Sequence, residues 1–308
     1  MANKTGTKGY RPRPGELRIG DCLRLPGDAP FVLFGIAEDL GIRTNGGRAG
    51  AAKTPEGVLT ALLNISINEW VPDNLLAWGG ILDLRKATSV DEIDKMVYAT
   101  VYPWFQKGYI PLVIGGGHNN SMPLLWAAHD ALDQPVNALN LDPHPDVRAL
   151  EGRHSGNGFS YAHNRGYLDR YAVLGMSENS VNSASLALLR STPGWTFETY
   201  ESWAVRGETS WESAMDRMLL HVQNAPFGLE IDADGITGAP ASAQTESGWS
   251  WTQARQLAYR AGQTGKVAYL HLSELALGLL PEDDHGGHSK AAAMLLLDFV
   301  RGTRNLPW

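Results

Sequence analysis

The chain has 308 residues, of which 43% are hydrophobic and 19% charged, a composition that suits one large α/β domain or two small ones. Its net charge of −7 argues against nucleic acid or an anionic membrane as a partner, and its single cysteine, Cys22, excludes an internal disulfide. The polar N-terminus lacks the apolar core of a signal peptide and no stretch is long enough to span a membrane, so we expect a cytoplasmic protein.

The first half of the chain alternates apolar runs with helical patterns. Residues 1–29 are rich in proline, glycine and arginine and predict a mostly irregular lead-in. Thr54-Pro55-Glu56 predicts the start of a helix with Thr54 as its N-cap, and Ser89-Val90-Asp91-Glu92 resembles a capping box for a helix to about residue 107. The other elements expected here are strands at 31–36, 75–84, 110–114 and 136–141, a glycine-rich loop at 37–51 and a helix at 121–132.

The second half continues the same alternation. The elements expected here are strands at 171–174, 195–198, 227–231 and 266–272 and helices at 180–189, 211–222, 250–261 and 289–300. The acidic and histidine-containing segment 282–288 is expected to be a solvated loop rather than a metal site. Because strands alternate with helices and no linker is long enough to mark a boundary, we predict a single domain over residues 1–308. Its mainly parallel sheet should be covered by helices on both faces.

Three polar residues follow the predicted strand 136–141 at alternate positions: Asp142, His144 and Asp146. Alternate residues of an extended chain point to the same side, so these side chains should converge. Asp142 and His144 each precede a proline, which favours extended backbone. Two carboxylates and an imidazole are costly to hold together unless a cation neutralises them, so the segment predicts a metal site. The alternative is a loop whose acids face water.

Three further strand ends carry polar groups. His118 follows one predicted strand, Asp232 and Asp234 follow another, and Glu274 follows a third. Sites in open α/β sheets lie outside the carboxyl ends of the strands, so these residues should meet the first group. Four aspartates and two histidines suit Mn²⁺, with Ni²⁺, Zn²⁺ and Co²⁺ as alternatives. Four carboxylates balance two dications, which predicts a two-metal centre that activates a water for attack on an electrophilic carbon.

Three motifs occur in order at these strand ends: GGGH at 115–118, D-x-H-x-D at 142–146 and D-x-D-G at 232–235. Together they resemble the metal motifs of the ureohydrolases, the family of arginase, agmatinase and formimidoylglutamase. The resemblance spans residues 31–300 and implies a three-layer α/β/α fold around an eight-stranded, mainly parallel sheet. It also implies two Mn²⁺ ions per chain, hydrolysis of a guanidine or amidine C–N bond, and a homo-oligomer such as a trimer or hexamer.

Within that family, three segments are more similar to formimidoylglutamase than to arginase: residues 41–51, 146–148 and 154–159. Departures from the family pattern are Pro143 within D-x-H, Thr237-Gly238 after D-x-D-G, and the residues after Glu274. The resemblance implies hydrolysis of N-formimino-L-glutamate, a linear amidine bearing carboxylates, to L-glutamate and formamide in histidine degradation. The alternatives are an arginase, agmatinase or guanidinobutyrase that releases urea, and a non-catalytic relative.

The six expected metal ligands form two sets that share Asp142 and Asp232 as bridges. The sets are His118, Asp142, Asp146 and Asp232 for one ion, and His144, Asp142, Asp232 and Asp234 for the other. His154 is expected to give a proton to the leaving amine, because imidazole titrates near neutrality; the alternative is a solvated loop histidine. Glu274 is expected to pair with the cationic amidinium of the substrate; the alternative is a surface acid.

Four residues are expected to contact the rest of the substrate: Arg148, Arg48, Asn45 and Asn157. Arg148 lies two residues after Asp146 and supplies a forked donor that matches a carboxylate. Arg48 could reach a second carboxylate. The alternatives are that Asn45 and Arg48 only brace their loop, and that Arg148 pairs with Glu151.

Overall fold

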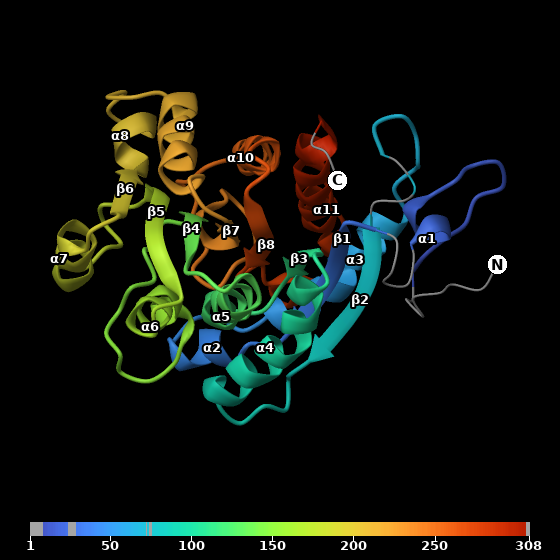
Figure 1. Ribbon diagram of the computed structural model, residues 1–308. Helices are drawn as coiled ribbons and strands as arrows, with labels where there is room; N and C mark the ends of the chain where they lie inside the picture. Colours follow the sequence, from blue (N-terminus) through green and yellow to red (C-terminus); the bar gives the residue numbers. More distant parts are fainter. Residues whose placement is uncertain (1–8, 24–28, 72, 74–75, 306–308) are drawn as a thin grey trace.

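The computed structural model describes residues 9–23, 29–71, 73 and 76–305. Across these residues eight strands form one sheet in the order β2-β1-β3-β8-β7-β4-β5-β6, and every neighbouring pair is parallel (Figure 1). The strands are β1 (Phe31–Ala37), β2 (Leu76–Asp83), β3 (Ile110–Ile114), β4 (Val136–Leu141), β5 (Leu168–Met176), β6 (Trp195–Thr199), β7 (Phe227–Asp232) and β8 (Val267–Ser273). The predicted α/β fold with about eight mainly parallel strands is confirmed.

Helices cover both faces of this sheet. The α-helices are α1 (Ile19–Cys22), α2 (Leu40–Thr44), α3 (Thr54–Leu63), α4 (Val90–Gln106), α5 (Ser121–Leu132), α6 (Gly158–Asn164), α7 (Ser183–Ser191), α8 (Tyr200–Ala204), α9 (Trp211–Val222), α10 (Trp251–Gln263) and α11 (His285–Gly302). One hydrophobic core contains side chains of α3, α9, α10 and α11, and a second contains side chains of α4, α5, α6 and α7. Sheet and cores together form the expected three layers.

The strands are buried on both faces, which explains their nearly continuous apolar sequence. In β4, Leu139 and Leu141 belong to the first core, whereas Val136 and Ala138 belong to the second. This alternation is the period of two that a strand imposes. Because all the strands run the same way, their carboxyl ends meet at one edge of the sheet, and the predicted metal ligands follow three of those ends.

Of the two predicted N-caps, the structure confirms Ser89 but not Thr54. Thr54 is not an N-cap, because α3 begins at Thr54 itself and its hydroxyl donates to the carbonyl of Leu275, which ties α3 to the segment after β8. Ser89 does cap α4: its hydroxyl accepts the N–H of Glu92 at 3.1 Å. The Glu92 carboxylate returns to the N–H of Thr88 at 2.9 Å rather than to Ser89.

The segment 282–288 is mostly exposed, as predicted, but the prediction that it forms a loop is wrong. Glu282–Asp284 form a 3-10 turn and α11 begins at His285, four residues earlier than expected. Three acids beside the positive end of the helix dipole favour this earlier start, although two glycines follow. The side chain of His285 also lies 3.1 Å from the carbonyl of Leu280, which holds the turn against the helix.

The short elements were the least predictable. Helices α1, α2, α6 and α8 have four to seven residues and were not predicted, and β5 is longer than the expected 171–174. In the lead-in, α1 is the one α-helix among the described residues 9–23 and 29; residues 1–8 and 24–28 lie outside the described part. No helix among the described residues combines the length and apolarity that crossing a membrane requires.

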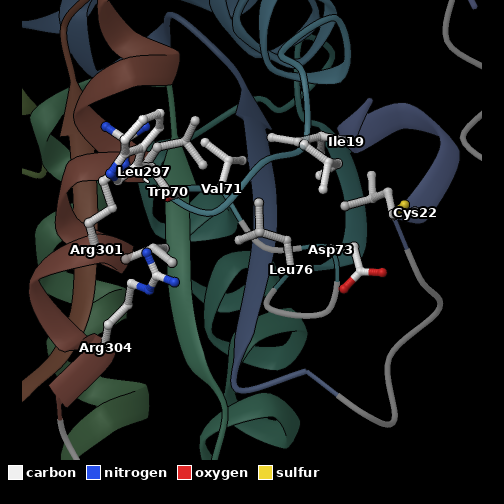
Figure 2. Close-up of a pocket in the computed structure, with 12 residues that line it drawn as sticks. Ile19, Cys22, Trp70, Val71, Asp73, Leu76, Leu297, Arg301 and Arg304 are labelled. Atoms are coloured by element: carbon white, nitrogen blue, oxygen red, sulfur yellow. Dashed lines mark hydrogen bonds between the residues drawn. The ribbon is translucent and has the colours of Figure 1, made fainter. Parts of the chain in front are cut away.

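A mostly apolar pocket lies beside α1 and the end of α11 (Figure 2). Ile19, Val71 and Leu297 line it together with Arg301 and Arg304. Leu76, which also lines it, is the first residue of β2, so the pocket lies toward the amino ends of the strands. The predicted metal ligands lie at the opposite edge of the sheet, so this pocket is separate from them.

A buried ion pair ties the loop before α6 to α4. The guanidinium of Arg153 donates to both carboxylate oxygens of Asp94, at 2.8 and 3.1 Å. It also donates to the carbonyl of Asn119 at 2.7 Å, next to the predicted ligand His118. Burial raises the pKa of Asp94 even though Arg153 opposes that shift, so the carboxylate depends on its partner.

Replacing Arg153 with methionine should strongly destabilise the fold, because the variant leaves a buried carboxylate without its partner. We expect a loss of about 3–5 kcal/mol in the free energy of unfolding, measured by urea denaturation. Arg217→Met is the control, since Arg217 pairs with Glu198 at the surface and should contribute less than about 1 kcal/mol. Equal losses for the two variants would contradict this view of the buried pair.

Candidate metal centre

Four buried side chains converge at the carboxyl edge of the sheet: His118, Asp142, Asp146 and Asp232. His118 opens the turn after β3, Asp142 and Asp146 follow β4, and Asp232 ends β7. Nδ1 of His118 lies 3.1 Å from Asp142, 2.9 Å from Asp146 and 3.0 Å from Asp232. One ligand atom from each of the four side chains lies within 4.8 Å of the others. This is the first of the two predicted ligand sets.

The chemistry of this donor set fits a divalent cation. Three carboxylate oxygens surround one imidazole nitrogen, which can share one proton at most. Nδ1 of His118 is buried and has no hydrogen-bond partner among the described residues, because none of these oxygens lies where its N–H would point. Carboxylates and an imidazole nitrogen facing one point are typical ligands of Mn²⁺ and related ions. The cluster is a metal-binding His/Asp group.

The second predicted set lies beside the first. Nδ1 of His144 is 3.5 Å from Asp142 and 3.9 Å from Asp234. Asp142 turns one oxygen toward His118 and the other toward His144, as a bridging ligand would. Asp234 is held by the hydroxyl of Ser242 at 3.2 Å. His144 is more open than the rest, with 33% of its side chain exposed.

The backbone of the D-x-H-x-D segment is not extended throughout. Asp146 has φ of 48°, in the left-handed region that side-chain-bearing residues rarely adopt. The predicted convergence of Asp142 and Asp146 is present, but the left-handed backbone at Asp146 contributes to it. The hydroxyl of Tyr171 donates to the carbonyl of Pro145 at 2.8 Å and so holds the chain just before Asp146.

Burial and mutual repulsion shift the carboxyl groups. Burial, reinforced by the charge of Asp142, raises the pKa of Asp146 and of Asp232 to about 7, and burial raises that of Asp234 to about 6. Burial opposes a charge on His118, but its neighbouring carboxylates raise its pKa well above the ordinary value. Protons and a cation therefore compete for these side chains.

A cavity of about 450 Å³ opens over the cluster. His144, Asp146, Asp232, Asp234 and Glu274 contribute to its lining on the metal side. Its walls come from loops that include the predicted substrate residues Asn45 and Arg148. A small molecule in this cavity could therefore touch both the ligand cluster and the loops.

Glu274 lines this cavity and is not a surface acid. Its side chain is buried, and its φ of 59° is again in the left-handed region. Oε1 accepts the N–H of His118 at 2.7 Å, whereas Oε2 has no hydrogen-bond partner among the described residues. Burial, together with Asp234 and Asp232, raises its pKa well above the usual range. The free oxygen suits a cationic donor group.

Arg148 is half-exposed and makes two contacts at the cavity wall. It donates to Oδ1 of Asn45 at 2.8 Å and forms an ion pair with Glu151 at 2.9 Å. Asn45 in turn donates to the hydroxyl of Ser155 at 3.1 Å. The ion pair between Arg148 and Glu151, which was the alternative to a substrate contact, is present, and Arg148 also borders the cavity. A contact between Arg148 and substrate stays a prediction.

Three predicted site residues do not line this cavity: His154, Arg48 and Asn157. Nδ1 of His154 accepts the N–H of Gly156 at 3.1 Å, and its Nε2 lies 3.3 Å from Glu151. Burial lowers the pKa of His154. Arg48 donates to the carbonyls of Ala241 and Ser242, which is the bracing arrangement.

Asn157 is the third of these residues. Its buried amide oxygen accepts from Arg153 at 2.9 Å and from the N–H of His154 at 3.1 Å. Its amide nitrogen donates to the carbonyls of Ala149 and Gly152. The side chain is thus occupied in bracing its own loop. Direct catalytic or substrate roles for His154, Arg48 and Asn157 stay predictions.

Two buried acids near the cluster were not anticipated. Glu38 follows β1 and accepts the N–H of Gly117 and the amide of Asn120, both at 2.8 Å, which shapes the turn carrying His118. Glu230 lies within β7, two residues before Asp232. A charged residue inside an otherwise apolar strand was the signal that could have revealed Glu230.

An all-parallel α/β sheet with a His/Asp cluster at its carboxyl edge defines a metal-binding α/β protein. The sequence profile of the arginase family matches residues 29–301, and the chain belongs to that family. It is therefore an arginase-family binuclear metal hydrolase, as the ureohydrolase resemblance implied.

The chain is similar to several formimidoylglutamases. That of Aromatoleum aromaticum is 28% identical over 315 residues, covering 96% of this chain and 90% of the relative. The crystal structure of a variant of the Trypanosoma cruzi formiminoglutamase with two Mn²⁺ is 25% identical, with a TM-score of 0.82 over 95% of this chain and 99% of that one. The Bacillus subtilis formimidoylglutamase, at 19% identity and a TM-score of 0.83 over 100% and 98% of the two chains, supports the fold alone.

Manganese binding should weaken as the pH falls. The folded pKa of Asp146 and Asp232, about 7, exceeds that of the unfolded chain, so these carboxyls stabilise the metal-free protein below about pH 4 and lose that contribution as the pH rises through 7. Mn²⁺ requires the ionised form. We expect about two equivalents per chain near pH 8, markedly weaker binding near pH 5, and a larger Mn²⁺-induced rise in Tm at the higher pH.

Metal analysis after gel filtration, together with thermal unfolding, checks this expectation. His118→Asn at pH 8 should leave about one firmly bound equivalent, since only one ligand set includes His118. A wild-type protein that retains no manganese at pH 8, or one whose Tm responds equally at both pH values, would contradict the two-ion centre.

Proposed function

We propose that the chain hydrolyses N-formimino-L-glutamate to L-glutamate and formamide. The observation that carries the proposal is the position of Arg148 on the wall of the cavity that opens over the His/Asp cluster. An arginine there can form a charge-assisted hydrogen bond with a substrate carboxylate. The naming of similar chains as formimidoylglutamases supports the same substrate.

The reaction adds water to the amidine carbon and breaks its bond to the glutamate nitrogen. Glu274 orients the amidinium with its free oxygen, while Oε1 remains bound to the N–H of His118. Arg148 fixes the carboxylate end of the substrate, so the amidine carbon faces the ligand cluster. When bound, two Mn²⁺ ions would lower the pKa of a water molecule, so that it could act as the nucleophile near neutral pH.

A guanidine hydrolase that releases urea is the second candidate. The ion pair between Arg148 and Glu151 favours it, because a neutralised arginine would repel agmatine less than a free one. Glu274 would accept a guanidinium as readily as an amidinium.

For either substrate, we also propose that the native metal is manganese, that the chain forms a single domain, that it assembles into a homo-oligomer, and that it is located in the cytoplasm.

A substrate panel separates the two candidates. Manganese-reconstituted protein should hydrolyse N-formimino-L-glutamate faster than arginine, agmatine or guanidinobutyrate, with formamide rather than urea as the product. Arg148→Met should raise KM for N-formimino-L-glutamate about 10- to 100-fold through loss of a charge-assisted hydrogen bond, with manganese content unchanged. Arg206→Met is the control, because Arg206 binds Glu178 and Glu208 and does not line the cavity.

Faster hydrolysis of agmatine by the wild type would favour the guanidine hydrolase. An Arg148→Met variant with unchanged KM would assign Arg148 to its pair with Glu151 instead.

We propose His154 as the acid that protonates the departing nitrogen. Its Nε2 contacts Glu151, which is paired with Arg148 at the cavity wall, so the ring is linked to the cavity through two side chains. His154→Ala should lower turnover by about 10²- to 10⁴-fold with manganese content unchanged. Turnover within tenfold of wild type, measured by steady-state kinetics, would assign the ring to its hydrogen bonds with the loop.

A further inference from the structure

The ring of His118 has a second nitrogen, which faces away from the three aspartates. Its Nε2 lies 3.4 Å from Oε2 of Glu230, and both side chains are completely buried. Glu230 and Asp232 are two residues apart on β7, so they point to the same face of the sheet. His118 is therefore placed between a carboxylate behind it and the ligand cluster in front.

Glu230 is itself fixed by the neighbouring strand. The hydroxyl of Tyr269 donates to Oε1 at 2.7 Å, and Nδ1 of His271 lies 2.7 Å from Oε2. Glu230 and His271 are direct partners in the register of β7 and β8. Nε2 of His271 lies 3.2 Å from the carbonyl of Gly115, in the segment that leads to His118. The carboxylate is thus held through both of its oxygens.

This arrangement selects one form of the His118 ring. A histidine that binds a metal through one nitrogen usually donates the N–H of the other to a carboxylate or carbonyl, which fixes both the tautomer and the ring orientation. Nε2 is buried, forms no hydrogen bond with the described residues, and has Oε2 of Glu230 3.4 Å away. In a metal-bound ring that donates Nε2–H to Glu230, Nδ1 carries no proton and faces the three aspartates. Among the carboxylates paired with His118 in the described residues, Glu230 is the one whose shortest contact is with Nε2 rather than Nδ1.

We propose that Glu230 is a positioning residue for the metal centre: it fixes the tautomer and orientation of His118, and His271 and Tyr269 fix Glu230. The inference rests on the proposed metal ligands and is independent of the substrate. It assigns a function to a buried acid that the hydrolysis itself does not touch.

Metal affinity provides the first test. Glu230→Met keeps the side-chain volume and removes the acceptor; it should weaken the binding of one manganese equivalent about 10- to 100-fold, measured from free Mn²⁺ by electron paramagnetic resonance. Glu230→Gln keeps an acceptor oxygen and should restore most of that affinity. Tyr269→Phe is the matched control: it removes a hydrogen bond from the same carboxylate but leaves Oε2 facing His118, so the affinity should change less than about threefold.

A spectroscopic signature separates positioning from simple core packing. In Zn²⁺-loaded wild type with ¹⁵N-labelled histidine, the Nε2–H of His118 should give a slowly exchanging, hydrogen-bonded proton signal. The signal should persist in Tyr269→Phe and disappear in Glu230→Met. If Glu230→Met does not fold, the wild-type spectrum still decides, because a His118 protonated on Nδ1 would overturn the proposal.

Metal binding by the wild type distinguishes a missing metal centre from a missing role of Glu230. Wild-type protein that binds neither Mn²⁺ nor Zn²⁺ would remove the metal centre itself. Wild-type protein that binds two ions, with Glu230→Met binding them equally well, would remove only the role of Glu230.

Discussion

Mutual repulsion among buried carboxylates is the constraint on which the rest of this site depends. Asp142, Asp146 and Asp232 point at one imidazole nitrogen and are buried at the base of the cavity. In a low-dielectric interior such charges cannot stay together unless protons or cations balance them. Hydrogen bonds from neighbouring residues fix the positions of the ligands: Glu38 shapes the turn that carries His118, and Ser242 holds Asp234. The sheet brings these groups together, and a metal relieves their repulsion.

The scaffold divides the work between strands and loops. The ligands lie at or just after the ends of strands whose register is fixed by parallel pairing. The cavity walls come instead from loops near Asn45, Arg148 and Asn182. Loops tolerate sequence change better than buried strands do. The metal ligands therefore belong to the sheet edge, whereas a proposed substrate contact such as Arg148 belongs to the loops.

The sequence could predict what depends on local periodicity. The strands follow from their apolar runs, and the meeting of Asp142, Asp146 and His118 follows from the position of sites in parallel sheets; the left-handed backbone of Asp146 was not predictable in this way. It could not predict which partner a side chain finds across the fold. Thr54 bonds to Leu275, more than 200 residues away, instead of capping its own helix. The hydrogen bonds of Arg48 to Ala241 and Ser242 and the place of Glu230 behind His118 likewise depend on tertiary packing.

Two residues that border the cavity have backbone angles that ordinary side chains disfavour. Asp146 and Glu274 both occupy the left-handed region, where a residue other than glycine is strained by about 1 kcal/mol or more. Glycine at either position would relax the backbone and also remove a buried carboxylate. The fold would then lose backbone strain and charge repulsion, and also lose a group aimed at the cavity. Stability and activity are therefore opposed at these positions, and selection for a more heat-resistant chain would tend to erase the site.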